Sequence, residues 1–286
     1  MRCSKISPPI GPSLMRPDPG TRLRRHSAGV TVAALACWLA WGVPQAAAQE
    51  RPALIAAAAD LKFALPDIAG AFARDAGKQV RITYGSSGDL ARQIAQGAPF
   101  EMLMSADERY VFDLHRAGLT RGEGALYATG RLALFAPRGS PLTLDADLRG
   151  LQVAVAEGRI TRFAIANPQH APYGQAARQV LERLGLWPRL QPALVLGENA
   201  SQAMQFAASG SCQGGIVPLS LASAPEIAKL GTFERIPPEW HAPLRQRMVL
   251  VARAGPVASA FYDYVRQAAA ARQTLSRFGF ALPEGK

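Results

Sequence analysis

A pair of serines, Ser86 and Ser87, is the feature of this sequence best suited to binding a ligand. The pair lies between Gly85 and Gly88, after a β-branched and aromatic run that predicts a strand and before apolar residues at helical spacing. At a helix start the first N–H groups lack an acceptor within the helix and the helix dipole is positive, so an anion can bind there without a cationic side chain. The hydroxyls would add donors, and the glycines would let the backbone approach a ligand. The alternative is that both serines only form the turn and cap the helix.

Other polar turns follow short apolar runs in the same way. Ala59 and Asp60 follow the run 53–58, and Asp107 follows the run 100–104. In a doubly wound α/β domain ligands bind at the carboxyl ends of the strands, so these turns should lie beside the serine pair. We expect Asp107 to cap a helix rather than to act as a catalyst.

The histidines do not indicate a catalytic or metal site. No two of His115, His170 and His241 have the spacing of metal ligands, and we expect His170 to shape a turn. Ser87, His170 and an aspartate could be drawn as a hydrolase triad, but the serine turn lacks the Gly-x-Ser-x-Gly elbow. The sequence therefore predicts no enzyme, no cofactor and no metal ion.

The elements that must position these turns form two sets of alternating strands and helices. The first set predicts a doubly wound α/β lobe, and a second set follows it. A late strand is expected to return the chain to the first lobe. Two α/β lobes, each a mostly parallel sheet flanked by helices, suggest a clamp that holds its ligand in the cleft between them. We expect the first lobe at 49–130 and 244–286, and the second at 131–243.

Residues 1–48 have the pattern of a secretory signal peptide. An arginine-rich stretch at 22–25 precedes an uncharged apolar run at 28–43, and small residues at 45–48 provide a cleavage site. The run is short for a membrane span. The two adjacent arginines leave open export through the general secretory route or the twin-arginine route. The start codon could be Met1 or Met15.

Net charge and cysteine content further limit the functional classes to which the protein can belong. The formal net charge is +11, and removal of residues 1–48 takes away six of the 32 Lys and Arg and one of the 21 Asp and Glu, which leaves +6. This excess is spread without a basic run, which argues against nucleic-acid binding and permits attraction of anions. Cys212 is the single cysteine after residue 48, so we expect a buried residue without a disulfide.

Several of these stretches, in order along essentially all of the chain after residue 48, resemble the periplasmic molybdate-binding proteins that feed an ABC importer. In that family a tetrahedral dianion is held by hydroxyls and backbone amides from both lobes, without a metal or a salt bridge. The resemblance implies the type II periplasmic binding protein fold. The matching stretches are 56–61, 85–94, 97–99, 105–107, 167–174, 214–217, 260–264 and 277–280.

Position by position, the resemblance implies that Ser87 gives its hydroxyl and amide, Tyr173 its hydroxyl or amide, and Ala200 its amide, with Ser86 beside them. It further implies a periplasmic monomer that binds molybdate or tungstate without a cofactor and passes it to an ABC permease. The alternatives are a binding protein for sulfate, thiosulfate or phosphate, a secreted enzyme on a similar fold, and a sensory module.

Two positions depart from the family pattern. Ala59 and Asp60 stand where a Ser or Thr hydroxyl is usual, and a carboxylate would repel a dianion in a low-dielectric cleft. We expect Asp60 to cap its own helix and leave neighbouring amides to the ligand; if it faces the cleft, hydrogen phosphate becomes more credible. Pro218 stands where some members place a ligand-binding tyrosine, and Tyr173 is the candidate to substitute for it.

Overall fold

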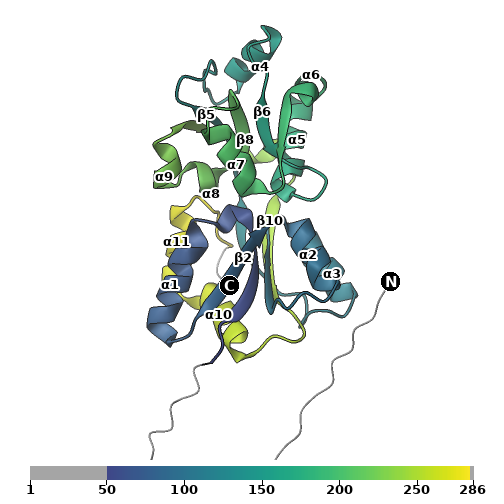
Figure 1. Cartoon of the computed structure of the whole chain (residues 1–286), viewed down its shortest axis with the longest axis vertical. Coiled ribbons are helices and arrows are strands. Elements are labelled where there is room, and N and C mark those ends of the chain that lie inside the picture. The colour runs from purple at the N-terminus through teal and green to yellow at the C-terminus, as the bar shows by residue number, and fades with distance from the viewer. Residues whose placement is uncertain (1–49, 284–286) are drawn as a thin grey trace, which may run out of the picture. The chain divides into compact units, whose positions relative to one another are not determined.

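The computed structural model describes residues 50–283, which form two lobes, each built on a five-stranded sheet (Figure 1). The signal peptide expected at residues 1–48 lies outside the described residues. In strand order, the first sheet contains β2 (Val80–Gly85), β1 (Ala53–Ala58), β3 (Met102–Ser105), β10 (Leu244–Leu250) and β4 (Ala125–Gly130). The second contains β7 (Leu194–Gly197), β6 (Phe163–Ala166), β8 (Gly214–Pro218), β5 (Leu132–Pro137) and β9 (Gly231–Arg235).

Each sheet is mostly parallel, with one strand running against the other four. In the first sheet β10 pairs antiparallel with both β3 and β4, and in the second β5 pairs antiparallel with both β8 and β9. These are the strands that follow the two crossings between lobes, from β4 to β5 and from β9 to β10. Both β4 and β9 end at the edge of their sheet where the parallel strands have their carboxyl ends. The chain therefore enters the other sheet at the corresponding edge, and its first strand there runs opposite to the other four.

Helices cover both faces of the first sheet. The core against α1, α10 and α11 contains Ile55, Met104 and Phe261, and the core against α2 and α3 contains Leu90 and Val111. Figure 1 shows these two groups of helices on opposite sides of the strands. Their bounds are α1 (Ala64–Ala76), α2 (Ser87–Ala95), α3 (Glu108–Arg116), α10 (Pro256–Gln267) and α11 (Ala269–Arg277).

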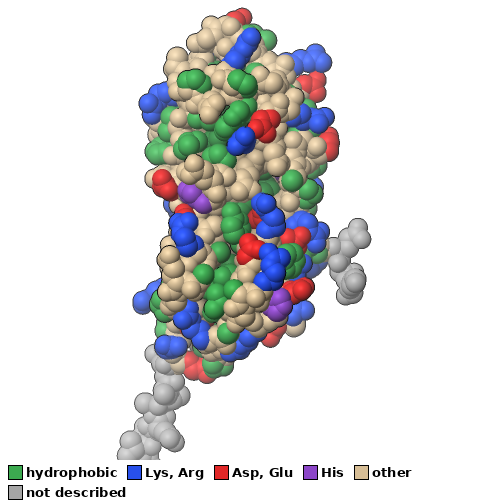
Figure 2. Space-filling view, turned by 90° about the vertical axis from the view of Figure 1, so that its right-hand side faces the viewer, with side chains coloured by type: hydrophobic (Ala, Val, Ile, Leu, Met, Phe, Trp, Pro, Cys, Tyr) green, Lys and Arg blue, Asp and Glu red, His purple; other side chains and the backbone are tan. Residues whose placement is uncertain are grey.

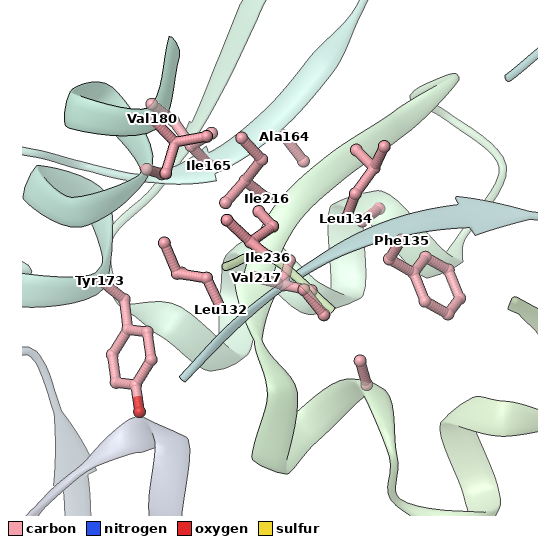
Figure 3. Packing of buried hydrophobic residues seen from close by; sticks show 14 of the residues in the cluster. Leu132, Leu134, Phe135, Ala164, Ile165, Tyr173, Val180, Ile216, Val217 and Ile236 are labelled. Carbon is pink, nitrogen blue, oxygen red and sulfur yellow. The ribbon is translucent and has the colours of Figure 1, made fainter. Parts of the chain in front are cut away.

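The second lobe has one large core, in which Leu134, Ile165 and Ile216 from three strands pack together with Val180 from α5 (Figure 3). Cys212 is buried in this core as a free thiol, as predicted. The helices of this lobe are α4 (Arg149–Ala156), α5 (Pro172–Arg183), α6 (Trp187–Leu190), α7 (Ala200–Ala208), α8 (Leu219–Ala222) and α9 (Pro225–Ala228). Three 3-10 turns complete the described chain: η1 (Ala59–Leu61), η2 (Gln191–Ala193) and η3 (Pro238–Trp240).

The surface carries charges of both signs. On the face in Figure 2, Lys and Arg side chains are interspersed with acidic and uncharged ones. Among residues 50–283, no helix combines the length and the apolar character needed to cross a bilayer.

The packing of α10 gives a test of how the C-terminal segment completes the first lobe. Phe261 is fully buried, and its ring meets Phe72 of α1 edge to face with centroids 5.1 Å apart. We expect Phe261→Ala to lower the free energy of unfolding by about 3–5 kcal/mol, because a large cavity remains. The exposed Val153→Ala is the control and should change it by less than ~0.5 kcal/mol. Denaturant unfolding measures both, and equal midpoints for the two variants would contradict this packing.

Candidate functional site

The structure brings all six predicted site residues to one small cavity between the lobes, with a volume of about 10 Å³. The first lobe contributes the turns after β1 and β2, and the second contributes the starts of α5 and α7. None of the described residues that line the cavity is Lys or Arg, so any anion there would be held by hydrogen bonds and helix dipoles. The lining residues are Ala58, Ala59, Asp60, Gly85, Ser86, Ser87, Ala106, Ala171, Pro172, Tyr173 and Ala200.

Three helix N-termini meet at this cavity. Ser87 is the first residue of α2, Tyr173 the second of α5 and Ala200 the first of α7. In these positions a backbone N–H has no acceptor within its own helix, and each helix adds roughly half a positive charge. The geometry therefore offers amide donors from both lobes around a single point.

Ser86 and Ser87 have different roles. The Ser86 hydroxyl caps α2: it accepts from the Asp89 amide at 3.2 Å and donates to Asp89 Oδ2 at 2.8 Å. The Ser87 hydroxyl accepts from the Ala106 amide at 2.9 Å and is buried. Because Ser87 Oγ is fixed as an acceptor in that contact, its own proton is free to be donated into the cavity. The capping interpretation thus holds for Ser86.

The expectation that Asp60 caps its own helix is wrong. Asp60 lies inside the turn η1 rather than before α1, and neither element has a side-chain cap. Its carboxylate instead binds distant partners: Oδ2 accepts from the Tyr173 hydroxyl at 3.0 Å and from Gln246 Nε2 at 2.6 Å. The extra 3-10 turn η1 thus carries a side chain that is bonded to partners from α5 and β10.

Burial controls the ionisation of Asp60. The residue is 1% exposed, and burial raises the pKa of its carboxyl to about 6, although the hydrogen bonds from Gln246 and Tyr173 act in the opposite direction. The same burial and the nearby Asp60 charge raise the pKa of Tyr173 and of Tyr127 well above 10. Both tyrosines are therefore neutral hydrogen-bond donors at neutral pH.

The Tyr173 hydroxyl is used inside the protein. It donates to Asp60 and accepts from Gln246 Nε2 at 3.0 Å. Figure 3 shows the Tyr173 ring extending from α5, with its oxygen directed away from the apolar cluster. Of the two contacts that the family resemblance implied for Tyr173, the amide is the one left for a ligand.

Gln246 and Gly130 are residues that the sequence interpretation missed. Gln246 Oε1 accepts from the Tyr127 hydroxyl at 2.7 Å, which orients its amide toward Asp60 and Tyr173. A Cβ at Gly130 would overlap the Tyr173 hydroxyl and lie 2.8 Å from Gln246 Nε2. The sequence signal available for Gln246 was a polar residue at the alternating position between Leu244 and Met248.

His170 does more than shape its turn, because it joins the lobes beside the cavity. Its carbonyl accepts from the Gly88 amide at 3.1 Å, and its Nδ1 lies 3.0 Å from Ser86 Oγ. Among the described residues, Asp89, His170 and Glu198 are the group whose ligand atoms, within 4.8 Å of one another, could hold a metal ion. Asp89 is already bonded to Ser86 and Arg92, and its Oδ2 lies 3.3 Å from His170 Nδ1, so Asp89 and His170 form a polar contact between the lobes.

Asp107 is a helix cap, as predicted, since its carboxylate accepts from the Arg109 amide at 2.9 Å at the start of α3. Arg109 also reaches across to Gln175 Oε1 of α5 at 2.7 Å. This further polar contact between the lobes lies outside the cavity.

Comparison with known proteins agrees with this architecture. A family model described as bacterial extracellular solute-binding protein matches residues 53–281. The chain belongs to this family. Among curated relatives of this solute-binding protein, the molybdate-binding protein ModA of Azotobacter vinelandii is 32% identical over 244 residues, which are 84% of this chain and 94% of the relative. ModA of Rhodobacter capsulatus is 33% identical over 242 residues, 84% of this chain and 90% of the relative.

A solved structure supports the same assignment of fold. The Azotobacter vinelandii periplasmic molybdate-binding protein superimposes with a TM-score of 0.74 at 30% identity, and the match covers 81% of this chain and 100% of the other. The two-lobed periplasmic binding protein fold, predicted with ligand binding between the lobes, is thereby confirmed for this solute-binding protein. The site residues themselves stay a prediction.

The buried carboxyl gives a pH-dependent prediction for stability. Because burial raises the folded-state pKa of Asp60 from 3.8 to about 6, its ionisation destabilises the fold; this penalty is absent below pH 4 and grows as pH rises through 6. We expect Asp60→Asn to raise the free energy of unfolding at pH 8 by up to about 3 kcal/mol, and to change it little at pH 4. The exposed Asp147→Asn is the control. Chemical unfolding at both pH values measures this, and a destabilised Asn variant at pH 8 would contradict it.

Proposed function

We propose that this protein captures molybdate outside the cytoplasm, binds tungstate nearly as well, and delivers the anion to an ABC importer. The observation that carries the proposal is the meeting of three helix N-termini and the Ser87 hydroxyl at one cavity, whose lining includes no Lys or Arg of residues 50–283. Three helix dipoles provide on the order of 1.5 positive charges, which suits a dianion. The names of the curated relatives support molybdate as that dianion.

The ligand contacts follow from the donors that remain. Ser87 offers its hydroxyl and amide from the first lobe, and Tyr173 and Ala200 offer amides from the second, so a bound anion would join the two lobes. A transporter that recognises the joined form would accept loaded protein in preference to empty protein. On this proposal the protein is a periplasmic monomer that catalyses no reaction and needs no cofactor or metal ion.

Hydrogen phosphate is the second candidate, and Asp60 is the observation in its favour. A buried carboxylate that lines the cavity can accept a hydrogen bond from an oxyanion that carries a proton, which fully ionised molybdate lacks. The helix termini would serve the other phosphate oxygens equally well.

Calorimetric titration with molybdate, tungstate, sulfate and phosphate tests the proposal. We expect tight one-to-one binding of molybdate and tungstate, weakened roughly 10- to 100-fold in Ser87→Ala, since a hydrogen bond to a charged group contributes about 1.5–3 kcal/mol. The control is Ser259→Ala, whose hydroxyl bonds only within the first lobe, to Gly255 and Arg121. Binding of phosphate without binding of molybdate would overturn the molybdate assignment.

A further inference from the structure

The two oxygens of Asp60 have different surroundings. Oδ2 accepts two hydrogen bonds, from the Tyr173 hydroxyl and from Gln246 Nε2, which use both of its lone pairs. Oδ1 is buried and has no hydrogen-bond partner among the described residues. The residue lines the cavity and is 1% exposed. An unpartnered carboxylate oxygen beside an anion cavity is a costly arrangement that demands an explanation.

No basic side chain of the described residues lies against the Asp60 carboxyl to compensate its charge. The helices α7 and α8 pack against η1 and contain no charged residue, although Ser220 of α8 donates to the Asp60 carbonyl at 2.8 Å. The titratable groups that face the carboxyl from α5 and β4 are Tyr173 and Tyr127, both neutral. No basic side chain of the described residues contributes to the ionisation of Asp60. A dianion entering this cavity would therefore meet a carboxylate that no basic side chain neutralises.

We propose that the oxyanion binds together with one proton, which is taken from solvent onto Oδ1 of Asp60. This inference rests on the proposed function, since it concerns how the same cavity accepts a dianion. The ionised carboxylate, one proton and the dianion combine into a neutral carboxylic acid hydrogen-bonded to the dianion. Oδ1 is the oxygen that receives the proton because Oδ2 is occupied as a double acceptor. Protonation removes the repulsion between two anions and converts Asp60 into a donor, the type of group that an oxyanion needs.

The ionisation of Asp60 in the free protein fits this linkage. With a pKa of about 6, the carboxyl is mostly charged at pH 7 and above, so binding at those values must draw in a proton. Affinity should then fall by up to tenfold for each pH unit above 6, and level off below it. Hydrogen phosphate behaves differently because it carries its own proton to an ionised Asp60, and would bind without net uptake.

The experiment is calorimetric titration of the protein with molybdate in buffers of different ionisation enthalpy, at pH 6, 7 and 8. We expect uptake of close to one proton per molybdate at pH 8, and a Kd that rises about tenfold from pH 7 to pH 8. Asp60→Asn should bind with no uptake and with a Kd independent of pH. An asparagine can keep its oxygen toward Tyr173 and Gln246 and direct its NH₂ into the cavity, so it imitates the protonated acid.

His170→Gln is the matched control, because His170 is a titratable side chain at Ser86 beside the cavity. We expect this variant to keep the proton uptake of the unaltered protein. Uptake that persists in Asp60→Asn, or binding of molybdate without uptake at pH 8, would overturn the inference while leaving the proposed function intact. Absence of molybdate binding at every pH would instead overturn the proposed function.

Discussion

The hydrogen bonds that converge on Asp60 connect the lobes at the cavity. Asp60 lies in the first lobe, Tyr173 comes from α5 of the second lobe, and Gln246 lies on β10, the strand that returns the chain to the first lobe. Tyr127 on β4 orients Gln246 from its other side. Because these groups are buried, each needs its partner, and the loss of one would leave the others unsatisfied. The absence of a side chain at Gly130 is what gives the Tyr173 hydroxyl room.

The position of this network follows from the strand order. Parallel strands direct the turns after β1 and β2 to one edge of the first sheet, and the turns after β6 and β7 to one edge of the second. The turns after β2, β6 and β7 lead directly to helices. The N-termini of α2, α5 and α7 therefore point at the same region. The fold thereby supplies partial positive charge without basic side chains. The cost is that any acidic group in the cavity is poorly compensated, which is the situation of Asp60.

Much of the fold and of the candidate site could be predicted from local patterns. The runs around Ala53–Ala58 and Phe163–Ala166 are short and apolar because parallel strands are buried on both faces, and their turns are polar because helix starts need caps. β4 and β9 were missed, since Ala125–Gly130 and Gly231–Arg235 are half-buried and lack a uniform apolar run.

The errors within the site have a different cause. Asp before a helical pattern usually caps the helix, and the expectation failed because η1 intervenes and distant partners bind the carboxylate. Gln246 lies 186 residues from Asp60, so no local pattern could join them. By contrast, the places of Ser87, Tyr173 and Ala200 at helix starts depend on local signals, and these residues do line the cavity.

The convergence of helix N-termini implies that the cavity between the lobes holds a tetrahedral oxyanion. A crystal structure grown with tungstate, with anomalous differences measured near a tungsten absorption edge, tests it most directly. We expect one dominant anomalous peak inside the cavity, with tungstate oxygens about 2.7–3.2 Å from Ser87 Oγ and from the amides of Tyr173 and Ala200. A dominant peak elsewhere, with the cavity lacking tungsten, would contradict it.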